Sequence, residues 1–275
     1  MTVRKNKRRI AAIQMVSTAD VDKNLQVVEK LVQQAAEQGA CLLVLPENFA
    51  TFALRDIGDI ARTEQTPQGP LRCFMSELAA KHGVFLLGGT VPVATGNSDK
   101  YLASSFCYDP SGNEIARYNK IHLFDAYVSD AHSSYRESDL YQHGTDVVAV
   151  DTGTFKTGLA VCYDLRFPEL FHQLRQLQTQ LVVLPSAFTY VTGQKHWQIL
   201  LQARAIENQC YILGANQGGW HDEKRRTWGH SMIVSPDGQV LASMEEGEGV
   251  VVADMDLRLL EEIRGQMPVS LHHRL

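Results

Sequence analysis

The chain alternates between short apolar runs and longer stretches in which apolar residues recur every three or four positions. Residues 20–39 show the second pattern, and Gly39 is a typical residue for the end of a helix. The apolar positions of this stretch are Leu25, Val28, Leu31, Val32 and Ala35. Residues 40–48 begin with an apolar run, as in a strand that is buried on both faces of a sheet. The pattern therefore predicts strands that alternate with amphipathic helices.

The second half of the chain repeats the order of the first half. We expect strands at 8–15, 84–93, 155–164, 181–188 and 210–217, and helices at 69–83, 168–180 and 195–209. Each half closes on a hairpin-like unit of strand, Pro- and Gly-containing turn and strand, within 101–120 and 230–257. Two mixed sheets packed face to face, with helices outside, would bury these runs in one α/β domain.

Composition narrows the class of protein. The chain has 275 residues, of which 44% are hydrophobic and 21% charged, so it can bury a large core. A net charge of −5 gives no general affinity for nucleic acid or anionic lipid. We interpret the basic run at 4–9 as belonging to a solvated leader over 1–8, followed by a single domain at 9–275. No secretory h-region follows it, and no apolar run reaches the ~18 residues that span a bilayer.

The cysteines indicate a reducing compartment. There are five, which is an odd number, and no C-x-x-C pair occurs. This pattern argues against a disulfide framework and against a structural zinc site. No H-E-x-x-H or similar ligand spacing appears either, so we expect no metal. Reduced thiols and the lack of a secretory signal predict a cytoplasmic protein.

Three apolar or strand-like runs end in an ionisable residue. They end at Glu47, Lys120 and Cys162. In α/β sheets, binding and catalytic groups gather at the carboxyl ends of strands, where loops are free and the sheet is rigid. We therefore expect these three side chains to form a site.

Each of the three residues also has an ordinary structural interpretation. Cys162 could be a core cysteine, as we expect for the other four, but polar residues follow it directly. A free thiol has a pKa near 8.5, and it could be activated by the helix that begins near Pro168 or by a neighbouring base. Glu47 could be a capping or surface carboxylate instead of that base. Lys120 could be solvated instead of stabilising an oxyanion.

The sequence resembles the nitrilase superfamily of carbon–nitrogen hydrolases. The resemblance is carried by "LPENF", "YNKIHLFD" and "LAVCYDLRFPEL", in that order, and extends over nearly the whole chain. It implies a four-layer α-β-β-α sandwich that forms a homodimer or higher oligomer and needs no cofactor. It also implies that Glu47 is the general base, Lys120 stabilises the oxyanion and Cys162 is the nucleophile. Glu137 matches a second glutamate that orients the lysine.

Further motifs are similar to the Nit branch of this superfamily. They include "PSAF", "ARAIENQCY" and "GHSMIVSPDG". The resemblance implies an amidase for a small keto-acid amide, deaminated glutathione, which carries several carboxylates. Arg166 could meet such a charge, and Tyr163 and Phe188 could form pocket walls, with core packing as the alternative. The cluster Lys224, Arg225 and Arg226 could also meet such charges, but a surface or structural role is the preferred interpretation for it.

Several alternatives remain open. The chain could be an ω-amidase that acts on 2-oxoglutaramate or 2-oxosuccinamate, or another amidase or nitrile hydrolase of the same superfamily. It could be a Cys–His hydrolase in which His172 or His196 activates Cys162. It could also be a non-catalytic sandwich that serves as a binding module, although all three catalytic positions hold competent residues.

Overall fold

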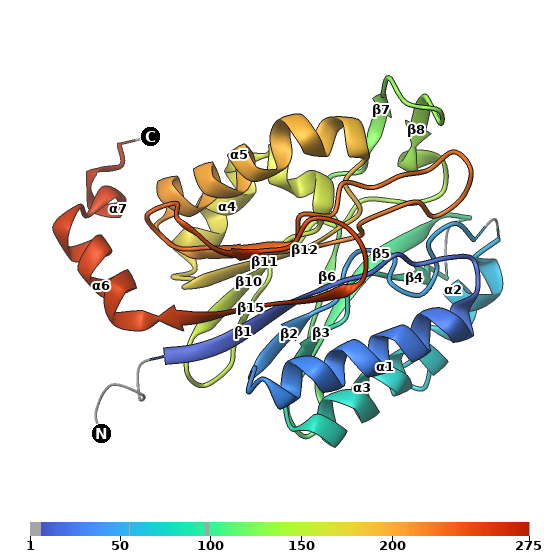
Figure 1. Ribbon diagram of the computed structural model, residues 1–275, viewed down its shortest axis with the longest axis horizontal. Coiled ribbons are helices and arrows are strands. Elements are labelled where there is room, and N and C mark those ends of the chain that lie inside the picture. The colour runs from blue at the N-terminus through green and yellow to red at the C-terminus, as the bar shows by residue number, and fades with distance from the viewer. Residues whose placement is uncertain (1–6, 55, 97–98, 275) are drawn as a thin grey trace.

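Two β-sheets lie face to face, and helices cover both outer sides (Figure 1). This computed structural model describes residues 7–54, 56–96 and 99–274. The first sheet has the order β15-β1-β2-β3-β5-β4, with β6 paired to β5. Its strands are β1 (Lys7–Gln14), β2 (Leu42–Val44), β3 (Phe85–Leu87), β4 (Val91–Ala94), β5 (Tyr101–Tyr108), β6 (Glu114–Asn119) and β15 (Gly249–Asp256).

The second sheet has the order β14-β13-β12-β11-β10-β9. Its strands are β9 (Ala149–Asp151), β10 (Lys156–Leu159), β11 (Leu181–Ser186), β12 (Tyr211–Asn216), β13 (Met232–Val234) and β14 (Val240–Ser243). In each sheet three neighbouring strands run parallel, β1-β2-β3 and β10-β11-β12, and the outer strands are antiparallel. Both sheets are therefore mixed, as the repeated pattern of the two halves predicts.

Helices form the two outer layers. The first sheet is covered by α1 (Val21–Glu37) and α3 (Pro70–His82), and the second by α4 (Pro168–Gln176) and α5 (Tyr190–Asn208) (Figure 1). Three further helices are α2 (Gly58–Thr63), α6 (Leu257–Gln266) and α7 (Val269–His272). Asp20 caps α1 by accepting a hydrogen bond from the backbone N–H of Lys23. The four-layer α-β-β-α sandwich is thereby confirmed.

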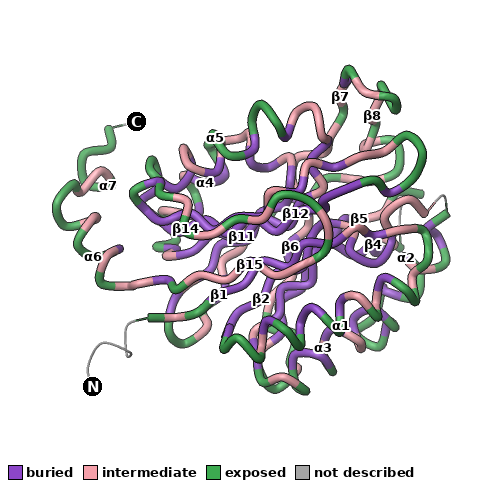
Figure 2. Tube along the Cα trace, viewed as in Figure 1, coloured by how far each residue is buried: buried purple, intermediate pink, exposed green. Residues whose placement is uncertain are grey.

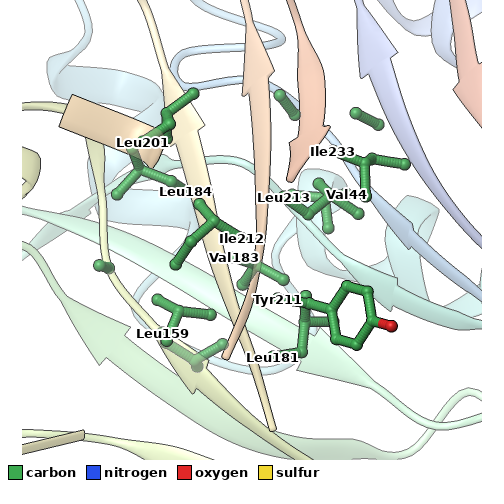
Figure 3. Packing of buried hydrophobic residues seen from close by; sticks show 14 of the residues in the cluster. Val44, Leu159, Leu181, Val183, Leu184, Leu201, Tyr211, Ile212, Leu213 and Ile233 are labelled. Carbon is green, nitrogen blue, oxygen red and sulfur yellow. The ribbon is translucent and has the colours of Figure 1, made fainter. Parts of the chain in front are cut away.

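The central strands are buried on both faces. Along β1, Ile10 and Ala12 belong to the apolar cluster between the sheets, whereas Ala11 and Ile13 belong to the cluster under α1 and α3. This alternation follows from the two-residue period of a strand. Figure 2 shows the buried interior of the sandwich, and Figure 3 shows the packing around β11 and β12. The rigid double sheet holds the loops at its strand ends.

Some elements differ from the expectation. The predicted strand 84–93 is split into β3 and β4, because the chain turns at Gly88 and Gly89. The predicted ladder 230–257 divides between the sheets: β13 and β14 pair in the second, while β15 pairs with β1 in the first. The helix expected at 195–209 already begins at Tyr190, and α2 and α6 were not expected. Of the predicted leader, residues 1–6 lie outside the described residues, whereas Lys7 and Arg8 belong to β1.

A two-stranded hairpin stands apart from both sheets. It consists of β7 (Asp125–Tyr127) and β8 (Ser134–Arg136), and it lies at the end of the molecule opposite the two termini (Figure 1). Among the described helices, none is both long and apolar enough to cross a membrane.

Candidate active site

The three ionisable residues at the strand ends come together at one edge of the sandwich. Glu47 follows β2 and Lys120 follows β6 in the first sheet, whereas Cys162 follows β10 in the second sheet. All three are buried and line one cavity. Glu137 joins them from the short 3-10 turn after β8. The site therefore depends on the packing of the two sheets against each other.

Lys120 is the centre of this cluster. Its Nζ donates to Glu47 Oε1 at 2.7 Å and to Glu137 Oε1 and Oε2 at 2.9 and 2.8 Å. Glu137 Oε2 also accepts a 2.6 Å hydrogen bond from the backbone N–H of Phe124. The Lys120 side chain is only 1% exposed. Two carboxylates thus hold the ammonium in a fixed position.

The charges of this cluster support each other. Burial opposes the charged form of Lys120, but Glu137 and Glu47 outweigh it and raise the pKa of Lys120 well above its usual range. Burial raises the pKa of Glu137, because it disfavours the charged carboxylate, and Lys120 partly offsets this effect. Lys120 therefore stays an ammonium at neutral pH, and it can stabilise negative charge that develops next to it.

Cys162 occupies a sharp turn between strand and helix. Its φ is 46°, which is uncommon for a residue with a side chain. It opens the 3-10 turn Cys162–Arg166, which leads directly into α4 at Pro168. Backbone strain of this kind costs of order 1–3 kcal/mol and persists where surrounding contacts enforce it. The turn presents the thiol to the cavity.

The thiol is protonated in the resting protein. Burial raises the pKa of Cys162 well above its ordinary value, and Glu47 raises it further by its charge and by accepting a hydrogen bond from the thiol. Lys120 and the backbone N–H of Ala187 act in the opposite direction, but they do not prevail. Of the two routes of activation considered from the sequence, proton transfer to a neighbouring base therefore fits this geometry.

A fully buried carboxylate, Asp164, lies under the turn. It accepts hydrogen bonds from the backbone N–H of Val161 at 2.8 Å and of His122 at 3.0 Å. The Tyr118 hydroxyl donates to it at 2.7 Å, and His122 Nδ1 lies 2.6 Å away. Asp164 was not among the functional residues expected from the sequence. Its position two residues after Cys162 was the available signal.

The loop that carries Glu47 is held in place by contacts to its backbone. Gln217, which is buried, donates from Nε2 to the Glu47 carbonyl oxygen at 3.2 Å and to Ser17 Oγ at 2.8 Å. Gly89 has a φ of 45°, and a Cβ there would lie 2.0 Å from the carbonyl oxygen of Pro46. Only glycine lets the chain pass so close to the residue before Glu47.

The cavity has a volume of about 380 Å³. Its polar and charged lining extends well beyond the cluster around Lys120. Further lining residues are Asn48, Phe52, Phe124, His132, Tyr135, Arg136, Tyr141, Thr189, Arg225, Arg226 and Thr227. Of this set, only Arg225 and Arg226 were candidates from the sequence. The others carry no distinctive spacing in the sequence, and Tyr135 and Arg136 among them belong to β8.

The three residues that the sequence suggested for substrate binding lie next to Cys162 but in a smaller recess. Tyr163, Arg166 and Phe188 line a pocket of about 20 Å³ that also contacts Cys162. Arg166 Nη1 lies 3.2 Å from His196 Nδ1, and its guanidinium lies 5.2 Å from the centre of the Phe188 ring. None of the three lines the larger cavity.

Neither histidine of the Cys–His alternative lines the larger cavity. His196 contacts Arg166, and His172 stacks on His273 with ring centres 4.4 Å apart. Over the described ranges, no group of three or more histidine, cysteine, aspartate or glutamate residues is arranged to hold a metal ion. The structure thus places the Glu47 carboxylate and the Lys120 ammonium next to the thiol, whereas His172 and His196 lie outside this cavity.

Comparison with known proteins agrees with this geometry. A family model described as carbon-nitrogen hydrolase matches residues 9–265. The chain is 41% identical to the deaminated glutathione amidase of Yersinia enterocolitica over 266 residues, or 96% of this chain and 92% of the relative.

Solved structures are similar as well. The NitFhit protein of C. elegans matches with a TM-score of 0.89 and 36% identity, over 98% of this chain and 65% of that one. A mutant of the amidase from Nesterenkonia sp. AN1 matches with a TM-score of 0.78 and 26% identity, over 96% and 99% of the two chains. In that structure acrylamide has added to the active-site cysteine.

Proposed function

The chain belongs to the carbon–nitrogen hydrolase family, and we propose that it is an amidase that acts on deaminated glutathione through a cysteine thioester. The observation that carries this proposal is the placement of Lys120 between Glu47 and Glu137, in the cavity that Cys162 also lines. The name of the relative from Yersinia enterocolitica supports the substrate.

The first half of the reaction forms the thioester. Glu47 takes the proton of the Cys162 thiol, and the sulfur attacks the amide carbonyl carbon. The oxyanion is stabilised by the Lys120 ammonium and a backbone N–H, for which we propose Tyr163. The C–N bond then breaks, and the proton held by Glu47 passes to the leaving nitrogen. The product that leaves is an amine, or ammonia from a primary amide.

The second half releases the acid. Glu47 is again a carboxylate, and it takes a proton from a water molecule that attacks the thioester carbonyl. The same donors stabilise the second oxyanion, and the proton returns to the Cys162 sulfur as the C–S bond breaks. Glu137 keeps Lys120 in position throughout, since it holds the ammonium with both oxygens. In the resting site Glu47 already contacts both Lys120 and the Cys162 thiol.

The substrate-binding roles of Tyr163, Arg166 and Phe188 belong to this proposal. Their recess opens beside Cys162, so it could accept a small part of the acyl group. The guanidinium of Arg166 could meet the carboxylate of a keto acid there. Exposed Ile199 and Ile206 on α5 support a homodimer or higher oligomer, and five free cysteines support a cytoplasmic location.

A substrate panel tests the proposal. Initial rates are measured on deaminated glutathione, 2-oxoglutaramate, 2-oxosuccinamate and a neutral aliphatic amide, with the Cys162→Ala variant as the blank. The proposal expects the highest kcat/KM on deaminated glutathione and no turnover by the blank. Faster turnover of 2-oxoglutaramate would identify an ω-amidase instead. Turnover that persists without Cys162 would exclude the thioester.

A further inference from the structure

The residues that line the cavity include more cations than carboxylates. Its charged lining consists of four cations, Lys120, Arg136, Arg225 and Arg226, and two carboxylates, Glu47 and Glu137. The whole chain has a net charge of −5, so this local sign is opposite to that of the molecule. Lys120 is shared by the two lining carboxylates. The three arginines pair with carboxylates that do not line the cavity, namely Asp139, Asp222 and Glu246, so the arginines line it without their partners.

Two of these arginines are held rigidly. Arg225 donates from Nε to Asp222 Oδ2 at 3.0 Å, and its guanidinium lies 5.2 Å from the ring centre of Phe52. The guanidinium of Arg226 lies 3.9 Å from the ring centre of Tyr190, and its Nη2 donates to Glu246. Both side chains are thus set in place before any ligand arrives, which lowers the entropy cost of binding.

The backbone at Arg225 and Arg226 is fixed as well. The carbonyl oxygen of Arg225 accepts from the His221 N–H at 3.0 Å, and that of Arg226 accepts from the Tyr190 N–H at 3.1 Å. Burial opposes the charge of Asp222, but hydrogen bonds from the Lys224 and Arg225 backbone and from the Arg225 side chain lower its pKa to about 2. The anchor of Arg225 therefore stays ionised at any pH used for an assay.

Several donors of the two guanidinium groups have no partner in the described residues. Arg226 Nε is buried and makes no hydrogen bond. Arg225 uses only its Nε, so neither of its two Nη atoms bonds to the described part of the protein. A buried N–H without an acceptor costs free energy, and such a group usually has a ligand or water to bind. A carboxylate fits the planar fork of a guanidinium.

We infer that Arg225 and Arg226 form a carboxylate-binding subsite of the catalytic cavity and give the enzyme a preference for anionic amides. The inference rests on the proposed function, because it assigns a substrate charge to the same cavity. It replaces the surface role that the sequence favoured for these two arginines. Lys224, the third member of that cluster, is exposed and does not line the cavity.

The test compares three variants: Arg225→Gln, Arg226→Gln and, as a matched control, Lys224→Gln. The substrates are amides with a carboxylate on the acyl side, on the amine side, on both sides or on neither. We expect each arginine substitution to lower kcat/KM on the anionic amides about 10- to 100-fold, chiefly through KM. On the neutral amide the change stays below about threefold, and Lys224→Gln behaves like the wild type on all four. The acyl-side and amine-side arms show which carboxylate is bound.

An equal loss on charged and neutral amides, or a loss that Lys224→Gln shares, overturns the subsite. A second readout does not need turnover: calorimetric binding of glutarate to Cys162→Ala, with and without the Arg225→Gln and Arg226→Gln substitutions. Binding that weakens at least tenfold supports the subsite, and unchanged binding contradicts it. A different result would show that only the proposed substrate is wrong. In that case the wild type would still prefer anionic amides, but it would turn over other anionic amides faster than deaminated glutathione.

Discussion

The buried carboxylate of Asp164 accepts a 2.7 Å hydrogen bond from the hydroxyl of Tyr118. Tyr118 precedes Lys120 by two residues, and His122, whose backbone N–H also donates to Asp164, follows it by two. The same carboxylate accepts from Val161, the residue directly before Cys162. Asp164 therefore joins the strand end that carries the ammonium to the turn that carries the thiol, although these belong to different sheets.

Replacing Asp164 with Asn is expected to disturb catalysis more than binding. The amide group would present a donor where the carboxylate accepts from several donors, so the turn and the lysine strand would shift relative to each other. A misplacement of the reacting groups by about 1 Å lowers kcat by up to about 100-fold, while KM changes little. Steady-state kinetics give the split, with Tyr118→Phe, which removes one donor, as a milder control. If the substitution changes only KM, or if the loss of activity equals the fraction of the variant that is unfolded, Asp164 has no positioning role.

Replacing Glu137 with Gln is expected to change the pH dependence of the rate. Glu137 contributes to the raised pKa of Lys120, so its removal lowers that pKa and the ammonium is lost at a lower pH. The alkaline limb of the kcat profile should move to lower pH, and kcat at neutral pH should fall by about 10- to 100-fold. An alkaline limb that stays where it is in the wild type would show that Glu137 does not tune Lys120.

Gly89→Ala should destabilise the loop of Glu47. The new Cβ meets the Pro46 carbonyl oxygen at 2.0 Å, and a φ of 45° is strained for alanine. We expect the free energy of unfolding to fall by about 1–3 kcal/mol, together with a drop in kcat. Urea unfolding measures the first effect. Gly265→Ala in α6 is the control, since a Cβ there meets no atom within 4 Å and should be neutral or slightly stabilising. Equal effects of the two substitutions would refute the explanation.

His221 should make the protein less stable in acid. Burial lowers its pKa to about 4, and its ring bonds to the Ser17 carbonyl oxygen and the Thr227 hydroxyl, each at 2.7 Å. The unfolded state takes up a proton near pH 6.5, so this contribution is complete above that pH and is lost as the pH falls toward 4. It is on the order of 3 kcal/mol.

Urea unfolding between pH 7.5 and pH 4.5 checks this, with the wild type compared to His221→Gln. The stability of the wild type should fall more steeply over this window than that of the variant, whereas His272→Gln, at an exposed position, should follow the wild type. Parallel curves for the wild type and His221→Gln would contradict the assigned role.

The local pattern of apolar residues, together with the motifs, was sufficient to predict the layers of the sandwich and the protein family. Buried strands such as β2 and β11 read as continuous apolar runs, and Gly39 and Pro168 mark helix boundaries. The transfer of β15 to the first sheet could not be predicted, because strand pairing between distant segments leaves no local signal. The break at Gly88 and Gly89 depends on Met75 and Pro46, which are near only in the folded chain.

In the candidate site, too, the residues that belong to motifs could be predicted, and those that depend on tertiary contacts could not. Glu47, Lys120, Glu137 and Cys162 were identified from motifs, and the structure brings them together. Asp164 was not predicted, because its role depends on a contact with Tyr118, which lies 46 residues away in the chain. Arg166 faces a narrow recess rather than the main cavity for the same reason: the sequence places it near Cys162 but does not give its direction.

In the proposed reaction Cys162 forms an acyl thioester, with Glu47 as its base. Mass spectrometry of rapidly quenched enzyme during turnover of deaminated glutathione tests this most directly. We expect the peptide that contains Cys162 to gain the mass of the acyl group, and the other four cysteines to stay unmodified. The Glu47→Gln variant should form little or no adduct. Steady turnover with no adduct on Cys162 at any quench time, and undiminished turnover by Cys162→Ala, would contradict it.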